Sequence, residues 1–314
     1  MTQIKKEYEV SSWERVEYQP NEKALAAQAK LEKDPENPRL WMEKGLALAE
    51  DKLYREAGEC YSHAIALDPF DGILYRHRGH RMLSQFRFED ACADFVLASR
   101  MIPENWDVWY HLGLSYFLLG NYEKAAQAYD RCLSLSKTEP DYTAVCDWYY
   151  MTCQRLGRMD KAKEILEYIR EDFDPGDNGA YFRRLLMYKG VLKPEEVLPK
   201  DLSSLPPLEI ITMGFGLSNY YYYQGDVEKS NQIIDQILKT GDEQDSYFAF
   251  GYLAAMADKG DRTKPKNKVK NASEKGPGFA LRPFLSSPIA LHIPFLSSVA
   301  GLSSRAPSSA KREP

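Results

Sequence analysis

Three glycines in the first half of the chain lie 34 residues apart, at Gly45, Gly79 and Gly113. The same residue types recur around each of them: an aromatic residue four positions before, an alanine twelve after and a second aromatic sixteen after. These columns are Trp41, Tyr75 and Trp109; Ala57, Ala91 and Ala125; and Tyr61, Phe95 and Tyr129. Glycine and alanine lack bulk, so two helix backbones can approach closely while the rings fill the wedge beside them. The period therefore predicts a stack of helical hairpins, each completing the core of its neighbour.

The columns resemble those of the tetratricopeptide repeat family, which also has small residues where this chain has Ala64, Ala98 and Cys132, and proline at Pro69 and Pro103. On that register the units begin at Pro38, Gly72 and Trp106, with departures at Lys44, Arg78 and Lys137. The resemblance implies an all-α fold, an α-solenoid of stacked antiparallel helical hairpins that forms a right-handed superhelix. It also implies a non-catalytic scaffold that binds a peptide or a partner protein in its concave groove.

A second set of glycines predicts the turns between the two helices of a unit, since glycine adopts the left-handed conformation past a helix end. The set is Gly120, Gly157, Gly190, Gly225 and Gly260. Aligned on it, four further, degenerate units begin near Thr143, Gly176, Ile211 and Ser246. Four prolines between residues 194 and 207 leave the second of these with one short helix, near residues 181–188. An irregular connector is expected near residues 190–210.

Four segments follow from these patterns: an N-terminal segment with a capping helix at residues 1–37, three well-matched units at 38–140, degenerate units at 141–261, and a basic tail at 262–314. The tail carries a net +8, which leaves −13 on residues 1–261 from the chain total of −5. Its composition is typical of disorder. The alternatives are an altered ending, because the pattern stops in mid-unit, and an arm for an acidic partner or a membrane surface. If the tail is disordered or is an altered ending, the helix before it has an uncovered face with Phe250, Tyr252, Leu253 and Met256.

Several classes of protein are not expected. The first residues are too polar for a secretory signal, and no run approaches roughly 18 apolar residues, so we expect no membrane span. Five scattered cysteines, Cys60, Cys92, Cys132, Cys146 and Cys153, indicate reduced, packed thiols and a cytoplasmic location. No nucleophile elbow, phosphate-binding glycine loop, HExxH or CxxC pair is present, so we predict no enzyme, no catalytic residue and no cofactor.

The predicted partner-binding groove lies along the first helices of the units. It comprises Met42, Leu46, Arg76, His77, His80, Tyr110, His111, Leu114 and Phe117. Equal positions in a stack form a ladder, so His77 and His111 are expected near each other. The alternatives for these histidines are a polar groove contact, a solvated or core-edge position, and a metal site. No carboxylate or cysteine stands at a ligand spacing beside them, and we predict no metal.

The resemblance also allows a test for one ligand, the C-terminal carboxylate of chaperone tails. Family members that hold it use lysine, asparagine and arginine at positions that read Met42, Leu46, His77, Asp107 and His111 here, so no such clamp is expected. Two further functions stay open: an accessory or regulatory subunit of an enzyme complex, and an RNA-binding helical array. The charge of −13 would repel phosphates, so we expect no nucleic acid. In the run of residues 220–223, all tyrosine, one or two should pack and the others lie at the surface.

Overall fold

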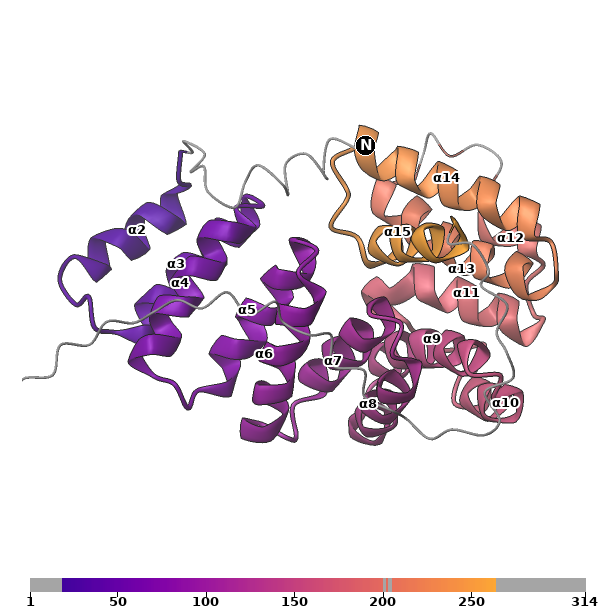
Figure 1. The fold of residues 1–314 in the computed structure, drawn as a ribbon, viewed down its shortest axis with the longest axis horizontal. Coiled ribbons are helices and arrows are strands. Elements are labelled where there is room, and N and C mark those ends of the chain that lie inside the picture. Colours follow the sequence, from indigo (N-terminus) through magenta and orange to yellow (C-terminus); the bar gives the residue numbers. More distant parts are fainter. Residues whose placement is uncertain (1–18, 200–201, 203–204, 264–314) are drawn as a thin grey trace, which may run out of the picture. The chain divides into compact units, whose positions relative to one another are not determined.

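The computed structural model describes residues 19–199, 202 and 205–263 of the 314-residue chain. It divides into two units, residues 1–265 and 266–314, and every described residue belongs to the first. The described part consists of helices joined by short turns, without a β-strand (Figure 1). The expectations for the N-terminal 18 residues and for nearly all of the basic tail lie outside the described residues.

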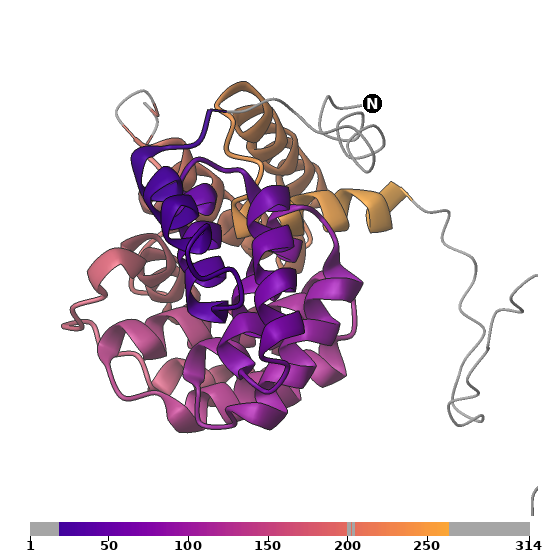
Figure 2. The same cartoon turned by 90° about the vertical axis from the view of Figure 1, so that its left-hand side faces the viewer.

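The first half is built from hairpins that pack one after another (Figure 2). A single helix, α2, precedes the first hairpin and packs on it. The bounds are α2 (Glu22–Leu31), α3 (Pro38–Glu50), α4 (Tyr54–Leu67), α5 (Gly72–Ser84), α6 (Phe88–Met101), α7 (Trp106–Leu118), α8 (Tyr122–Leu135), α9 (Glu139–Arg155) and α10 (Met159–Glu167). The predicted all-α solenoid of antiparallel hairpins is therefore confirmed.

The glycine and aromatic columns meet inside each hairpin. A Cβ atom added at Gly45 would lie 2.6 Å from the ring of Tyr61, and one at Gly79 would lie 3.1 Å from Phe95. At Gly113 it would overlap Tyr129. All three rings are buried. Glycine recurs at this position because the aromatic ring of the second helix occupies the space of a side chain on the first.

Two further features repeat with the same period. The helix N-caps Asn37, Asp71 and Asn105 each accept a backbone hydrogen bond, from Arg39, Ile73 and Val108 respectively. The first aromatic column is tied to the turn before it by its polar atoms. Trp41 Nε1 donates to the Pro35 carbonyl at 2.8 Å, Tyr75 to Pro69 at 3.1 Å, and Trp109 to Pro103 at 2.8 Å. Both features set where each unit begins.

The second half is less regular. It contains η1 (Gly176–Asn178), α11 (Gly179–Lys189), α12 (Pro194–Val197), α13 (Pro207–Tyr223), α14 (Val227–Glu243) and α15 (Phe250–Thr263). Positive φ angles at Gly120, Gly157, Gly190 and Gly225 confirm four of the predicted turns. The prediction for Gly260 is wrong, because α15 continues through it to Thr263. The short helix before the proline-rich connector is confirmed as α11.

The left-handed turn position is itself a column, and glycine fills it only from the third unit onward. Lys52 and Phe86 precede Gly120 at the same spacing and have φ angles of 60° and 62°. Both reach the segment before α15. Lys52 Nζ lies 2.8 Å from Asp245 Oδ2, and the rings of Phe86 and Tyr247 stack at 6.3 Å. Two non-glycine residues thus adopt a disfavoured conformation where they contact residues 193 and 161 positions later in the chain.

The face of α15 expected to be uncovered is in fact buried. Tyr252 and Leu253 are fully buried, and α15 packs on α13 and α14 and reaches α7. Asp258 lies 2.8 Å from Arg155 of α9, with 6% and 12% of the two side chains exposed. The expectation fails because α15 packs against the preceding helices α13, α14 and α7. The run of tyrosines behaves as predicted: Tyr221 is buried, and Tyr223 is 37% exposed.

A charged pair lies in the core where α9 of the first half meets α11 of the second. Arg184 of α11 and Asp147 of α9 are both fully buried, and Arg184 Nη2 lies 3.0 Å from Asp147 Oδ2. Arg184 also donates to the Thr212 carbonyl at 3.1 Å and lies over the ring of Trp148 at 5.7 Å. A Cβ atom at Gly216 of α13 would overlap this arginine, so the glycine makes room for it.

Candidate functional site

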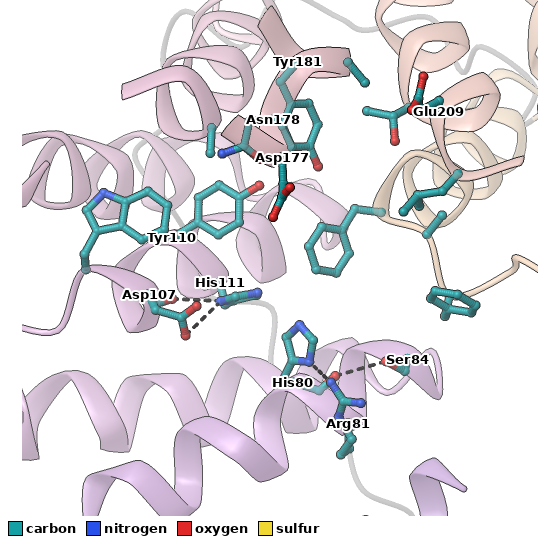
Figure 3. A pocket seen from close by; sticks show the side chains of 18 of the residues that line it. His80, Arg81, Ser84, Asp107, Tyr110, His111, Asp177, Asn178, Tyr181 and Glu209 are labelled. Atoms are coloured by element: carbon teal, nitrogen blue, oxygen red, sulfur yellow. Dashed lines mark hydrogen bonds and ion pairs between the residues drawn. The ribbon is translucent and has the colours of Figure 1, made fainter. Parts of the chain in front are cut away.

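A cavity of about 540 Å³ lies between helices from both halves of the described chain. Residues of α5 and α7 face it from one side, and residues of η1, α11 and α13 from another (Figure 3). Its lining residues are Tyr54, His80, Arg81, Ser84, Trp106, Asp107, Tyr110, His111, Ala144, Asp177, Asn178, Ala180, Tyr181, Leu208, Glu209, Thr212, Phe248, Ala249 and Phe250. The walls therefore combine aromatic surface with a few charged groups, the composition typical of ligand pockets.

Two histidines meet at the cavity wall. The rings of His80 on α5 and His111 on α7 are 4.6 Å apart and nearly perpendicular, and both contact Phe250 of α15 at 5.9 and 5.7 Å. His111 also stacks on Phe95 at 5.5 Å. Its Nδ1 lies 2.8 Å from the Asp107 carbonyl, which can only accept, so this nitrogen carries the proton. Both rings are thus held by packing on several sides.

A chain of charged groups runs behind His111. Asp107 pairs with the Nε of Arg76 and lies 3.3 Å from His111 Nδ1. Burial alone would raise the pKa of Asp107, but His111 and Arg76 hold it well below its ordinary value. Arg76 also contacts the ring of His77 at 3.1 Å. Burial, with Arg76 alongside, lowers the pKa of His77 to about 4. Asp107 is therefore ionised, and its Oδ2 contacts both Arg76 and His111.

The described cysteines are buried or half-buried free thiols. Burial raises the pKa of both Cys60 and Cys153 to about 11. Thiols of this kind are weak nucleophiles at neutral pH. In the part of the chain that the structure describes, no group of three or more His, Cys, Asp or Glu side chains could hold a metal ion. Within the same residues, no helix has the length and apolar character needed to cross a membrane.

Comparison with protein families identifies the repeats. A tetratricopeptide repeat family model matches residues 22–72, and a second one matches residues 106–138. The chain contains tetratricopeptide repeats. Proteins with this fold typically mediate protein–protein interactions and are generally non-catalytic.

Curated relatives of this chain match only part of it. Anaphase-promoting complex subunit 3 of Schizosaccharomyces pombe is 24% identical over 43% of this chain and 23% of its own length. Tetratricopeptide repeat protein 33 of Homo sapiens is 28% identical over 35% of this chain and 42% of its own. The chain thus spans less than half the length of these two relatives. Among solved structures, YrrB, described as a TPR protein with an unusual peptide-binding site, is similar with a TM-score of 0.45 and 19% identity. That match covers 75% of this chain and 99% of the other.

The predicted groove residues fall into three groups. His80, Tyr110 and His111 line the cavity, and Arg76 and His77 lie behind it. Met42 and the 40% exposed Leu46 are on α3 and do not line the cavity. Leu114 and Phe117 are buried in the core, because α7 is covered on nearly all sides.

The histidine ladder differs from the prediction. The ring that meets His111 is His80, whereas His77 stacks on Tyr61 at 5.5 Å. Residues at the same position of successive repeats were expected to lie side by side. The contact instead joins His111 to His80, which lies one helical turn after His77 on α5.

Most of the cavity lining was not predicted, including Asp177, Tyr181, Leu208, Glu209, Phe248 and Phe250. These residues lie in units where the repeat columns are weak, so periodicity gives no signal for them. The aromatic cluster at residues 247–250 was visible in the sequence, but only tertiary packing brings it to α5 and α7.

Proposed function

We propose that this protein is a non-catalytic scaffold that binds a peptide segment of a partner protein in the cavity. The cavity carries the proposal because its volume of about 540 Å³ and its aromatic lining suit the insertion of side chains. It is lined by the first helices α5 and α7, the elements that face the concave side in stacked helical hairpins. Binding there requires only shape, apolar burial and a few polar contacts.

The polar groups of the cavity are arranged for binding rather than for catalysis. Ser84 donates its hydroxyl to the His80 carbonyl at 3.3 Å and not to a histidine ring, so it is not activated by a base. His111 is occupied by Asp107. The acidic body also favours a protein over a nucleic acid. We place the protein in the cytoplasm because its described cysteines are free thiols, buried or half-buried, and thiols stay reduced in that compartment.

A second candidate is a subunit of a larger complex. The relative from Schizosaccharomyces pombe is named as a complex subunit, and it matches 43% of this chain. The two functions differ in the contact that holds the partner. A complex subunit would bind the rest of its complex through a large interface, whereas the scaffold binds a short segment in the cavity. Co-purification with one enzyme at fixed stoichiometry would favour the subunit.

Site-specific photocrosslinking tests the proposal. A photoreactive amino acid replaces Leu208, which is 50% exposed and lines the cavity, or Val227, which is 44% exposed and does not. In extracts of the source cells, position 208 is expected to crosslink to one short segment of a partner, as mapped by mass spectrometry. Equal crosslinking from both positions, or none from position 208, would contradict the proposal.

A further inference from the structure

The charges in the cavity are unequal. Its lining residues include three carboxylates, on Asp107, Asp177 and Glu209, and a single arginine, Arg81. Asp107 is neutralised by Arg76. Within the described residues, neither Asp177 nor Glu209 has an ion pair or a side-chain hydrogen bond. Two carboxylates on the η1 and α13 side are thus available to a ligand.

Aromatic rings stand beside these carboxylates. In Figure 3 the Asp177 side chain points into the cavity next to the rings of Tyr110 and Tyr181, and Glu209 faces the same space. Tyr110 is held in place by Trp106, whose ring stacks on it at 5.0 Å. Aromatic faces attract cations, and they do so more strongly where water is partly excluded. Rings and carboxylates together form a site for positive charge.

The opposite side of the cavity restricts where a cation can bind. Arg81 lies on α5 with its guanidinium over the ring of Tyr54, 5.0 Å from the ring centre. A second positive charge close to it would be repelled. The ligand cation is therefore confined to the side of Asp177 and Glu209. Arg81 also contacts the His80 ring through its Nη2, and its remaining N–H groups can donate to peptide carbonyl groups.

We propose that the cavity binds a lysine or arginine side chain of the partner peptide, with its charge beside Asp177 and Glu209. The aliphatic part of the side chain packs against Tyr110 and Tyr181. This inference rests on the proposed function and specifies its ligand. The charge of −13 on residues 1–261 acts in the same direction, because it attracts basic segments from a distance.

Peptide mixtures measure this preference on the full chain. The probes are fluorescent heptapeptides with a fixed central residue, lysine, glutamate or Nε-acetyl-lysine, and random flanking residues. Fluorescence anisotropy is expected to show tighter binding of the lysine mixture than of the other two. Acetylation removes the charge and keeps the aliphatic part of the side chain. Higher salt should weaken the binding of the lysine mixture, since the carboxylates are solvent-accessible.

A double variant with a matched control assigns the binding to the cavity. Asp177→Asn with Glu209→Gln is expected to weaken binding of the lysine mixture roughly fivefold, the effect of losing two accessible ion pairs. Glu167→Gln with Glu171→Gln removes the same charge at exposed positions outside the cavity and should leave binding unchanged.

The outcomes separate this inference from the proposed function. Preference for the glutamate mixture would overturn the basic ligand and leave peptide binding intact. An equal loss in both double variants would overturn the assignment to Asp177 and Glu209. If none of the three mixtures binds, the peptide-binding function itself fails and the inference fails with it.

Discussion

Arg184 and Asp147 place two opposite charges in the core without exposure to solvent. Desolvating such a pair costs about as much free energy as its attraction returns, so the pair adds little net stability. It does fix which faces of α9 and α11 meet, because an unpaired charge at this position would be costly. Gly216 of α13 completes the arrangement, since any side chain there would displace Arg184.

Breaking the pair should be much worse than removing it. Asp147→Asn leaves Arg184 buried without a counter-charge and is expected to lower the free energy of unfolding by about 3–5 kcal/mol. Asp147→Leu with Arg184→Met should recover most of that loss. Urea denaturation of the two single variants and the double variant gives the coupling energy. Additive losses would show that the two side chains do not act as a pair.

His77 should make stability depend on pH. Burial, together with Arg76, lowers its pKa from an ordinary 6.5 to about 4. Between these values the unfolded chain binds a proton that the folded chain does not, so the stability due to His77 is present above pH 6.5 and falls as the pH drops towards 4. His77→Gln is expected to lose less stability than the wild type between pH 7 and pH 4.5.

Urea midpoints across that range measure the difference, and His63→Gln, at an exposed position, controls for the loss of a histidine. Burial raises the pKa of Asp147 to about 7, which acts in the opposite sense over the same range. The comparison therefore has to be made between variants and not on the wild type alone. Identical pH dependence in the wild type and His77→Gln would rule out this role for His77.

At the scale of single elements, each hairpin depends on a glycine that faces a ring. Gly113→Ala would place a methyl group in the space of Tyr129. Overpacking of this kind costs about 1–3 kcal/mol, while the better helix propensity of alanine returns about 1 kcal/mol. We expect a net loss of stability, relieved when Tyr129→Leu is added.

Gly58→Ala on α4 is the matched control for this substitution. The atom nearest to its new Cβ would be Gln85 Nε2, at an ordinary 3.8 Å. Here only the gain in helix propensity remains, up to about 1 kcal/mol. Thermal unfolding followed by circular dichroism compares the variants. Equal effects of the two alanines would mean that the ring does not set the requirement for glycine.

The elements could be predicted where one residue type has one physical role. Glycine facing a ring, and glycine in the left-handed turn, identified the hairpins and four of their turns. The same reasoning failed at Gly260, where the helix continues. It also missed that Lys52 and Phe86 occupy the turn column of the first two units, because neither residue type favours positive φ.

The candidate site was less predictable because it depends on the whole molecule. His80, Tyr110 and His111 were predicted from their place on the first helices, and all three line the cavity. Asp177 and Glu209 were not, since they lie in irregular units and reach the cavity only through the packing of η1 and α13. Their position opposite residues of the first half results from tertiary packing, which no sequence spacing encodes.

Truncation separates the contribution of α15 from that of the tail. A chain ending at Pro265 is expected to keep the thermal midpoint of the full protein, because every described contact is retained. A chain ending at Ala249 loses the buried Tyr252 and Leu253, each worth about 1.5–3 kcal/mol. It also leaves Arg155 without Asp258. Its midpoint should fall sharply in differential scanning calorimetry, whereas equal midpoints would mean that α15 is dispensable.

Contacts from Lys52 and Phe86 to residues 245–247 have a consequence for how the molecule loses its structure. In an open stack of repeats, each unit senses only its neighbours, so the ends can fray independently and the transition is spread over several steps. Here the first units also depend on the last ones. Unfolding of one end of the array breaks contacts that stabilise the other end, and the hairpins are therefore expected to unfold together in one cooperative transition.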